Sequence, residues 1–298
     1  MNAVDVRDLK KQFGTANALR GVSFSVAPGE VFGYLGPNGA GKTTTLRILL
    51  GLVRASAGSA KILGIPSADP HSRTDIGFLP GNLRLYGDMT VAATLDYFAR
   101  FRPTRPPRLR STLVSALNVD AETLARRVKF LSDGTLQKIG LIVAMQHDPA
   151  LLLLDEPTNG LDPLVQHAFR GIVSDFAARG RAVLFSSHVL SEVEAVCNRV
   201  AILRQGELVA LETIQHMREK VVRKLSVRFR DTVPTGLGEI AGVTRSEVQG
   251  REMSLWVRGD INPVLRALAD AGIDDMVFPK AELEDIFLGY YQAGARDD

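Results

Sequence analysis

The sequence predicts an α/β protein with a parallel β-sheet, opening strands before it and an appended α+β domain after it. Two observations carry this prediction. Short, mostly apolar runs at residues 31–35, 151–154 and 182–185 are typical of strands buried on both faces. Helical patterns lie between these runs, and that alternation favours parallel strands joined by crossover helices.

The first part of the chain is predicted to form strands. Val4, Val6 and Leu9 precede a turn at Gly14, and residues 22–26 alternate apolar and polar side chains. After the buried run at 31–35 the chain becomes glycine-rich, and residues 42–52 have a helical pattern.

Helical patterns dominate from about residue 90 to 147, so residues 88–150 are expected to form a helical subdomain. Residues 100–110 interrupt it with five arginines and three prolines, and proline cannot continue a helix. A further helix is predicted over residues 163–179, between two buried strands.

The pattern changes near residues 217–223. Beyond it apolar and polar residues alternate over 225–229 and again over 253–257, and helices are expected near 263–271 and 282–291. We therefore predict two domains, residues 1–218 and an α+β accessory domain over residues 219–298.

Composition excludes several classes of protein. With 298 residues, 45% apolar content, 36 basic and 33 acidic side chains, the chain is not disordered as a whole. The single Cys197 excludes a disulfide framework and a cysteine-rich zinc site, and fits a reducing compartment. No apolar run approaches the roughly 20 residues of a membrane helix, and the charged residues 1–11 do not resemble a secretory signal.

A phosphate-binding loop follows the strand at 31–35. The pattern G-x-x-x-x-G-K-[ST] lies between a predicted strand and a predicted helix, where backbone amides and the helix dipole favour a polyphosphate. Its lysine is suited to the β- and γ-phosphates and its threonine to Mg²⁺. The predicted ATP-binding residues are Gly36, Pro37, Asn38, Gly39, Ala40, Gly41, Lys42, Thr43 and Thr44.

A carboxylate pair ends the buried strand at 151–154. Asp155 is expected to hold Mg²⁺ together with Thr43, and Glu156 to polarise an attacking water. A strand capped by two carboxylates is common in isolation, but the phosphate loop earlier in the chain favours a nucleotide site that binds ATP and Mg²⁺.

Residues 131–138, LSDGTLQK, place an N-capping serine before an apolar helix. With the phosphate loop and the carboxylate pair, this segment makes the chain resemble the nucleotide-binding subunits of ATP-binding cassette (ABC) transporters, whose signature has the form L-S-G-G-Q-x-Q-R. The resemblance covers roughly residues 1–212. It implies a P-loop NTPase core with the ABC-type antiparallel β subdomain and helical subdomain.

The resemblance also implies roles for single residues. His188 looks like the switch histidine that contacts the γ-phosphate, and Phe13 like the aromatic that stacks on adenine. Asp162 looks like part of the loop that crosses the dimer interface. Ser132 and Gly134 are expected to act in trans, on ATP held by a partner, because the phosphate loop already fills the cis side. The expected assembly is a homodimer, or a pair with a similar ABC subunit, around two MgATP.

The chain departs from the family pattern at two places. Gly81 and Asn82 stand where the family usually has a glutamine that senses Mg²⁺ and the permease, which leaves the role of this position open. Asp133 replaces a signature glycine and puts an anion beside a phosphate-binding helix start. Because Lys42, Glu156 and His188 are all present, ATP hydrolysis is still expected.

The resemblance implies an ATPase subunit that powers a separately encoded membrane permease, with residues 81–90 docking against it. Residues 283–291 look like the end of subunits in the drug- and antibiotic-export branch, which favours an exporter of small hydrophobic compounds. The protein is then expected to be cytoplasmic and peripheral on the membrane through the permease. The arginines at 100–110 form either a solvated loop or a contact with permease, lipid or nucleic acid, although no nucleic-acid partner is expected.

Two other functions stay open at this point. One is an ABC ATPase that does not serve transport and acts on ribosomes or DNA. The other is a nucleotide-gated regulatory module with little turnover, which Gly81 and Asp133 would favour.

Overall fold

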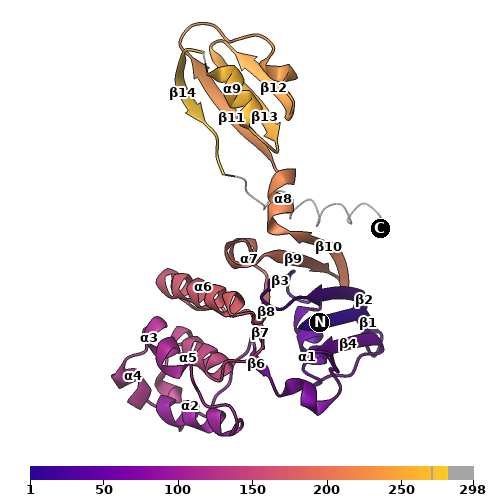
Figure 1. Ribbon diagram of the computed structural model, residues 1–298, viewed down its shortest axis with the longest axis vertical. Helices are drawn as coiled ribbons and strands as arrows, with labels where there is room; N and C mark the ends of the chain where they lie inside the picture. Colours follow the sequence, from indigo (N-terminus) through magenta and orange to yellow (C-terminus); the bar gives the residue numbers. More distant parts are fainter. Residues whose placement is uncertain (270, 281–298) are drawn as a thin grey trace. The chain divides into compact units, whose positions relative to one another are not determined.

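The computed structural model describes residues 1–269 and 271–280, and the chain divides into two compact units, Met1–Leu211 and Glu212–Asp298 (Figure 1). The division falls inside strand β10 (Glu207–Thr213). The boundary expected after residue 218 falls inside helix α8 (Ile214–Lys220). Each unit has its own hydrophobic core and is described by itself.

An antiparallel sheet begins the first unit, in the strand order β2-β1-β4-β5. It comprises β1 (Val4–Phe13), β2 (Ala16–Val26), β4 (Ala57–Ile62) and the two-residue β5 (Ile65–Pro66). Alternate residues of β1 and β2 point inward, so Val4, Leu9 and Val26 are fully buried. The strands predicted for this part of the chain are confirmed.

A six-stranded sheet in the order β10-β9-β3-β8-β7-β6 forms the centre of the unit. Its other strands are β3 (Val31–Leu35), β6 (Ile76–Leu79), β7 (Leu151–Asp155), β8 (Ala182–Ser187) and β9 (Arg199–Arg204). Strand β8 pairs in parallel with both β3 and β7. The carboxyl ends of these three strands therefore meet at one edge of the sheet, where α/β folds place their ligands.

Helices α1 (Lys42–Leu49), α6 (Pro163–Ala178) and α7 (Leu190–Val196) pack against this sheet. Helix α1 ends three residues before the predicted end at residue 52, and α6 agrees with its predicted range to within one residue. The α/β fold class predicted from the sequence is confirmed. Sequence reasoning assigned no strands to residues 199–213, where β9 and β10 lie.

Between β6 and β7 the chain forms helices α2 (Val91–Arg100), α3 (Arg110–Ala116), α4 (Ala121–Ala125) and α5 (Asp133–Met145) (Figure 1). The predicted interruption at residues 100–110 separates α2 from α3. Its arginines are not merely solvated. Arg105 forms a bidentate ion pair with Asp75, and Arg102 donates to the carbonyl of Ile76, so the segment is anchored to the start of β6.

The second unit contains a four-stranded antiparallel sheet in the order β12-β13-β11-β14. The strands are β11 (Val222–Phe229), β12 (Val243–Gln249), β13 (Glu252–Arg258) and β14 (Ile273–Val277), and helix α9 (Asn262–Leu268) packs its buried Val264 and Leu268 into their core. The alternation predicted for residues 225–229 and 253–257 is confirmed. The expected helix at 282–291 and the export-branch resemblance at 283–291 lie outside the described residues.

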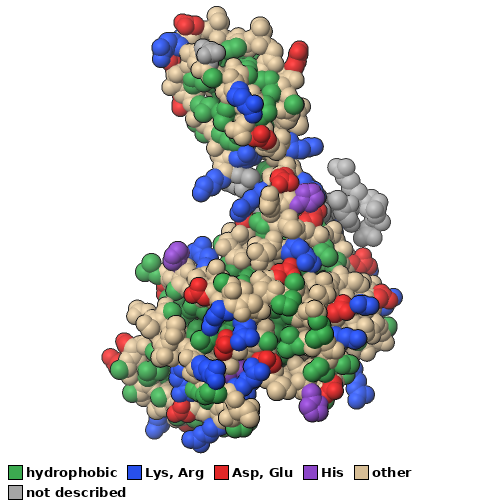
Figure 2. Space-filling model, in the orientation of Figure 1, with side chains coloured by type: hydrophobic (Ala, Val, Ile, Leu, Met, Phe, Trp, Pro, Cys, Tyr) green, Lys and Arg blue, Asp and Glu red, His purple; other side chains and the backbone are tan. Residues whose placement is uncertain are grey.

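Within the described part of the chain, none of the helices has the length and apolar character needed to cross a bilayer. Figure 2 shows apolar and charged side chains interspersed over the visible face of the molecule.

Candidate functional site

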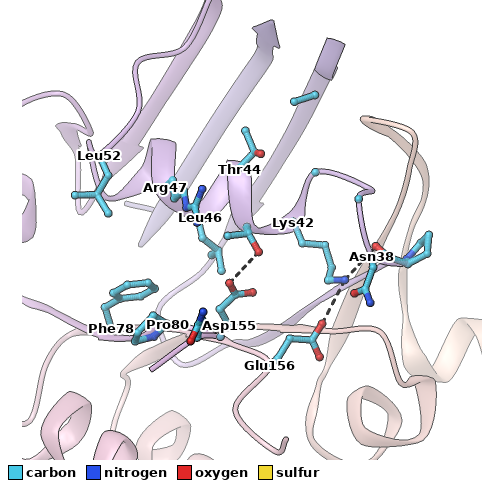
Figure 3. Close-up of a pocket in the computed structure, with 17 residues that line it drawn as sticks. Asn38, Lys42, Thr44, Leu46, Arg47, Leu52, Phe78, Pro80, Asp155 and Glu156 are labelled. Carbon is cyan, nitrogen blue, oxygen red and sulfur yellow. Dashed lines mark hydrogen bonds and ion pairs between the residues drawn. The ribbon is translucent and has the colours of Figure 1, made fainter. Parts of the chain in front are cut away.

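A pocket of about 550 Å³ lies where the phosphate loop faces the end of strand β7 (Figure 3). The loop lies between β3 and helix α1, and the opposite wall is formed by the ends of β6 and β7. The lining residues are Ala18, Pro37, Asn38, Gly39, Gly41, Lys42, Thr43, Thr44, Leu46, Arg47, Leu52, Phe78, Pro80, Gly81, Asn82, Asp155 and Glu156. Most of the predicted phosphate-loop residues therefore lie together in one cavity.

The backbone of the phosphate loop requires its glycines. Gly41 caps α1 with φ of 110°, and Gly39 has φ of 82°, both in the left-handed region that L side chains rarely adopt. A Cβ atom on Gly36 would lie 2.4 Å from the carbonyl oxygen of Leu203. These constraints aim the loop and the first turn of α1 at the pocket, where amides and helix dipole favour a bound anion.

Lys42 is buried, with only 5% of its surface exposed, and its ammonium is held inside the site. It donates to the carbonyl oxygens of Gly36 at 2.6 Å and Pro37 at 3.2 Å. Its Nζ also lies 3.3 Å from Oε1 of Glu156. Little water screens these contacts, so the lysine supplies a strong local positive charge for a polyphosphate.

Asp155 is fixed from two sides at the end of β7. Thr43 donates its hydroxyl to Oδ2 of Asp155 at 2.9 Å, and Ser186 donates to Oδ1 at 2.5 Å. A hydroxyl and a carboxylate facing each other form an oxygen donor set that suits Mg²⁺. Thr43 and Asp155, which the sequence paired as metal ligands, are therefore brought together, and their chemistry fits that ion.

Glu156 carries the second carboxylate, and its backbone has φ of 50°, in the left-handed region. For a residue other than glycine this conformation costs on the order of 1 kcal/mol, and it persists only where surrounding contacts impose it. The side chain is 13% exposed, with Oε2 lying 2.8 Å from Nδ1 of His188 and Oε1 near Lys42. The structure thus brings Lys42, Glu156 and His188, the three predicted catalytic residues, into one chain of contacts.

The signature segment begins helix α5. Ser132 is its N-cap and accepts a hydrogen bond from the amide of Thr135 at 3.3 Å. Gly134 packs so closely on the loop after Glu156 that a Cβ would lie 2.5 Å from the carbonyl oxygen of Gly160. Asp133 is exposed in the first turn, where its negative charge interacts favourably with the helix dipole.

His188 and the loop residues Gly36 and Ala40 are not among the residues that line this pocket, and neither are four other predicted residues. Ser132 and Gly134 belong to the start of α5. Asp162 caps α6 by accepting from the amide of Val165 at 3.0 Å. Phe13 ends β1 with half of its surface exposed and Nζ of Lys11 4.5 Å from the ring centroid. Their predicted roles toward ATP and a partner subunit stay predictions.

Sequence reasoning assigned no role to two residues that hold the carboxylate pair. Ser186, at the end of β8, bonds to the side chain of Asp155 and accepts from the amide of Glu156 at 3.2 Å. Gln137, in α5, bonds to the backbone after β7. Both lie inside segments that the sequence singled out, and Gln137 is one of the positions that match the signature, but the sequence did not indicate their long-range contacts.

Comparison with known proteins was made at the levels of family, sequence and structure. The family model described as ABC transporter matches residues 19–159. An uncharacterized ABC transporter ATP-binding protein from Nostoc sp. (strain PCC 7120) is 39% identical over 72% of this chain and 68% of its own length. A Nod factor export ATP-binding protein I from Paraburkholderia xenovorans is 33% identical over 96% of both chains.

A solved dimeric structure of a bacterial ABC transporter cassette superposes with a TM-score of 0.65. The match has 20% sequence identity and covers 71% of this chain and 98% of that one. At this identity the likeness shows a shared fold.

Proposed function

This chain belongs to the family of ABC transporter ATP-binding proteins, and on that premise we propose how its site hydrolyses ATP and which assembly it powers. The protein is an ATPase subunit of a transporter. The observation that carries the proposal for its chemistry is the contact series Lys42–Glu156–His188. In it one oxygen of the Glu156 carboxylate lies beside the lysine ammonium and the other beside the imidazole.

The positions of these side chains support the following roles. Glu156 is the general base that accepts the proton of the attacking water, because it is the carboxylate beside the phosphate-loop lysine. Lys42 and the loop amides stabilise the charge on the transferring phosphoryl group. His188 contacts the Glu156 carboxylate through Nδ1 and would also contact the γ-phosphate.

Thr43 and Asp155 would hold Mg²⁺ through their facing oxygens. When bound with the nucleotide, this ion would neutralise charge on the phosphate oxygens. Ser186 fixes the orientation of the Asp155 carboxylate, and Gly81 leaves the space beside it open, since a Cβ there would lie 3.3 Å from Oδ2.

The assembly that we propose is a head-to-tail dimer in which Ser132 and Gly134 act on the partner's ATP. Both residues lie outside the lining of the chain's own pocket, and the solved cassette of the same fold is a dimer. The second copy is either this chain or a similar ABC subunit. Phe13 is then the adenine-stacking residue, and Asp162 belongs to the loop between the subunits.

The subunit is proposed to power a separate membrane permease and to sit on the cytoplasmic face of the membrane through it. The full-length likeness to a Nod factor export protein favours export as the direction of transport. A nucleotide-gated module with little turnover remains the second candidate, since Gly81 replaces the usual glutamine.

A phosphate-release assay separates these two candidates. Replacing Glu156 by Gln removes the base and should lower kcat by a factor of roughly 10² to 10⁴. Lys42→Ala should abolish MgATP binding as well as turnover. Equal phosphate release by the wild type and Glu156→Gln would remove Glu156 from its role, and a wild type that binds MgATP at no measurable turnover would favour the regulatory module.

The dimer is tested in the hydrolysis-deficient Glu156→Gln protein. Light scattering with saturating MgATP should show the mass of two chains, and Ser132→Ala in this background should return it to one. Ser132→Ala also removes a helix cap, which costs about 1 kcal/mol. Thr90→Ala is the matched control, because Thr90 caps α2 in the same way, accepting from the amide of Ala93. Loss of the dimer in both variants, or in neither, would contradict the trans role of Ser132.

A further inference from the structure

One face of helix α5 contacts the loop that follows Glu156. Gly134 and Gln137 are three residues apart, so they lie on the same side of the helix. Gly134 lies against the backbone of Gly160, at the far end of the loop. Gln137 donates through Nε2 to the carbonyl oxygens of Glu156 at 3.3 Å and Pro157 at 3.0 Å, at its near end.

The carboxamide of Gln137 suits this position better than a carboxylate or an apolar side chain would. The residue is 8% exposed, and both of its partners are acceptors, so the carboxamide must face them with its NH₂ group. Two carbonyls bonded by one NH₂ cannot be served by a carboxylate, and an apolar side chain would leave both without this donor. Buried acceptors that lose their donor cost free energy, so the loop would move to find water or another partner.

Glu156, to whose carbonyl Gln137 donates, has a strained backbone. Glu156 has φ of 50°, its amide donates to Oγ and to the carbonyl oxygen of Ser186, and its carbonyl accepts from Gln137. Its backbone is thus tied to β8 on one side and to α5 on the other. These two ties fix the backbone from which the carboxylate extends. Among the described residues, the side chain itself has polar contacts only with Lys42 and His188.

We propose that Gln137 is a positioning residue that sets the Glu156 carboxylate for catalysis and links it to the start of α5. The inference rests on the proposed function in one respect: Ser132 and Gly134, at that start, serve the ATP of a partner. Movement of α5 when the partner's nucleotide binds would then pass through Gln137 to the base of the chain's own site. The two sites of the dimer would be coupled through this one carboxamide.

The test replaces Gln137 by Met, which keeps the length of the side chain and removes the amide. The expected result is a loss in kcat of roughly tenfold or more with KM for ATP changed by less than about twofold, because the base is misplaced and the phosphate loop is intact. The Hill coefficient for ATP should fall toward one. Gln137→Asn, which keeps the amide on a shorter stem, should give an intermediate kcat and serves if the Met variant does not fold.

Gln146 provides the matched control. It follows α5, is 1% exposed, and also donates through Nε2 to a backbone carbonyl, that of Leu95, far from the pocket. Gln146→Met should lower the thermal unfolding temperature and leave kcat unchanged per folded molecule. A Gln137→Met protein with wild-type kcat, or equal losses of kcat in both variants, would overturn the proposal.

The same experiment keeps this failure distinct from failure of the proposed function. If the wild type neither dimerises with MgATP nor turns it over, the proposed function is wrong. If the wild type does both and Gln137→Met matches it, only the positioning role is wrong. A lower kcat with an unchanged Hill coefficient would keep the positioning role and overturn the coupling between sites.

Discussion

Single side chains in the site bond to one another. Lys42 is bonded to two loop carbonyls and to Glu156, and Thr43 to Asp155. In the proposed mechanism a triphosphate would compete with these internal partners of Lys42, and that competition would free Oε1 of Glu156.

His147 is a second buried titratable residue, outside this site. It is 5% exposed, and Nε2 lies 3.3 Å from the carbonyl oxygen of Ile76, which also accepts from Arg102. Burial, and next the nearby guanidinium of Arg102, lower the pKa of His147 from 6.5 to about 4, although Asp75 opposes the shift. Protonation of His147 in the folded state would place a second cation, besides Arg102, at the carbonyl oxygen of Ile76.

The pKa of His147 predicts a loss of stability in acid. His147 takes up its proton near pH 6.5 in the unfolded chain and only near pH 4 in the folded chain. The free energy of unfolding that depends on neutral His147 is therefore fully present above pH 6.5 and is lost as the pH falls toward 4. Between pH 7.5 and 5.0 the wild type should lose about 2 kcal/mol more than His147→Gln. Urea unfolding at the two pH values measures the difference. Equal losses in both proteins would show that His147 does not titrate in this range.

Residue types at the site could be predicted from the sequence because each motif is local. The phosphate loop, the carboxylate pair and the histidine after β8 are each defined by neighbours within about ten residues. Gln137 matches the signature, but its contacts and those of Ser186 could not be found in this way, because their partners lie 20 and 31 residues away, at Pro157 and Asp155. Only the packing of α5 and β8 against the end of β7 gives them a function.

Elements meet at this site through close backbone contacts. Helix α5 approaches the loop after β7 so closely that only a glycine fits at position 134. From the sequence, Gly134 was expected only to act on ATP held by a partner. The structure shows that it is needed within the chain as well, since the obstructing atom is the carbonyl oxygen of Gly160.

Gly134→Ala should therefore destabilise the protein, by about 1–3 kcal/mol, because the added methyl group must push α5 and the loop apart. Gly171 gives the comparison. It lies within α6, and a Cβ there would meet no heavy atom within 4 Å. Gly171→Ala should stabilise the protein by up to about 1 kcal/mol through helix propensity. Chemical denaturation of both variants is the measurement, and changes of the same sign would refute the steric account of Gly134.

The whole molecule combines two units with separate cores. Leu225, Leu255 and Val257 are fully buried in the second unit, whereas the core of the first is built from residues between Ala3 and Leu203. The alternating pattern of apolar residues predicted β11 and β13 of the second unit. It could not predict β12, β14 or the order of the strands, because exposed residues such as Val248, Met276 and Val277 give no inward-facing pattern.

Leu255→Ala should remove about 2–5 kcal/mol from the second unit and leave nucleotide binding by the first unchanged. Calorimetry should show one thermal transition shifted to lower temperature and another in place. Leu153→Ala, which removes an equally buried leucine from β7, should do the reverse and weaken MgATP binding. A common shift of all transitions in both variants would mean that the units unfold together.

The separate cores carry a consequence for how this protein changes over generations. Inherited substitutions in the C-terminal unit alter packing there without altering the packing that supports hydrolysis. Natural selection can therefore vary that unit while the nucleotide-binding unit is inherited intact.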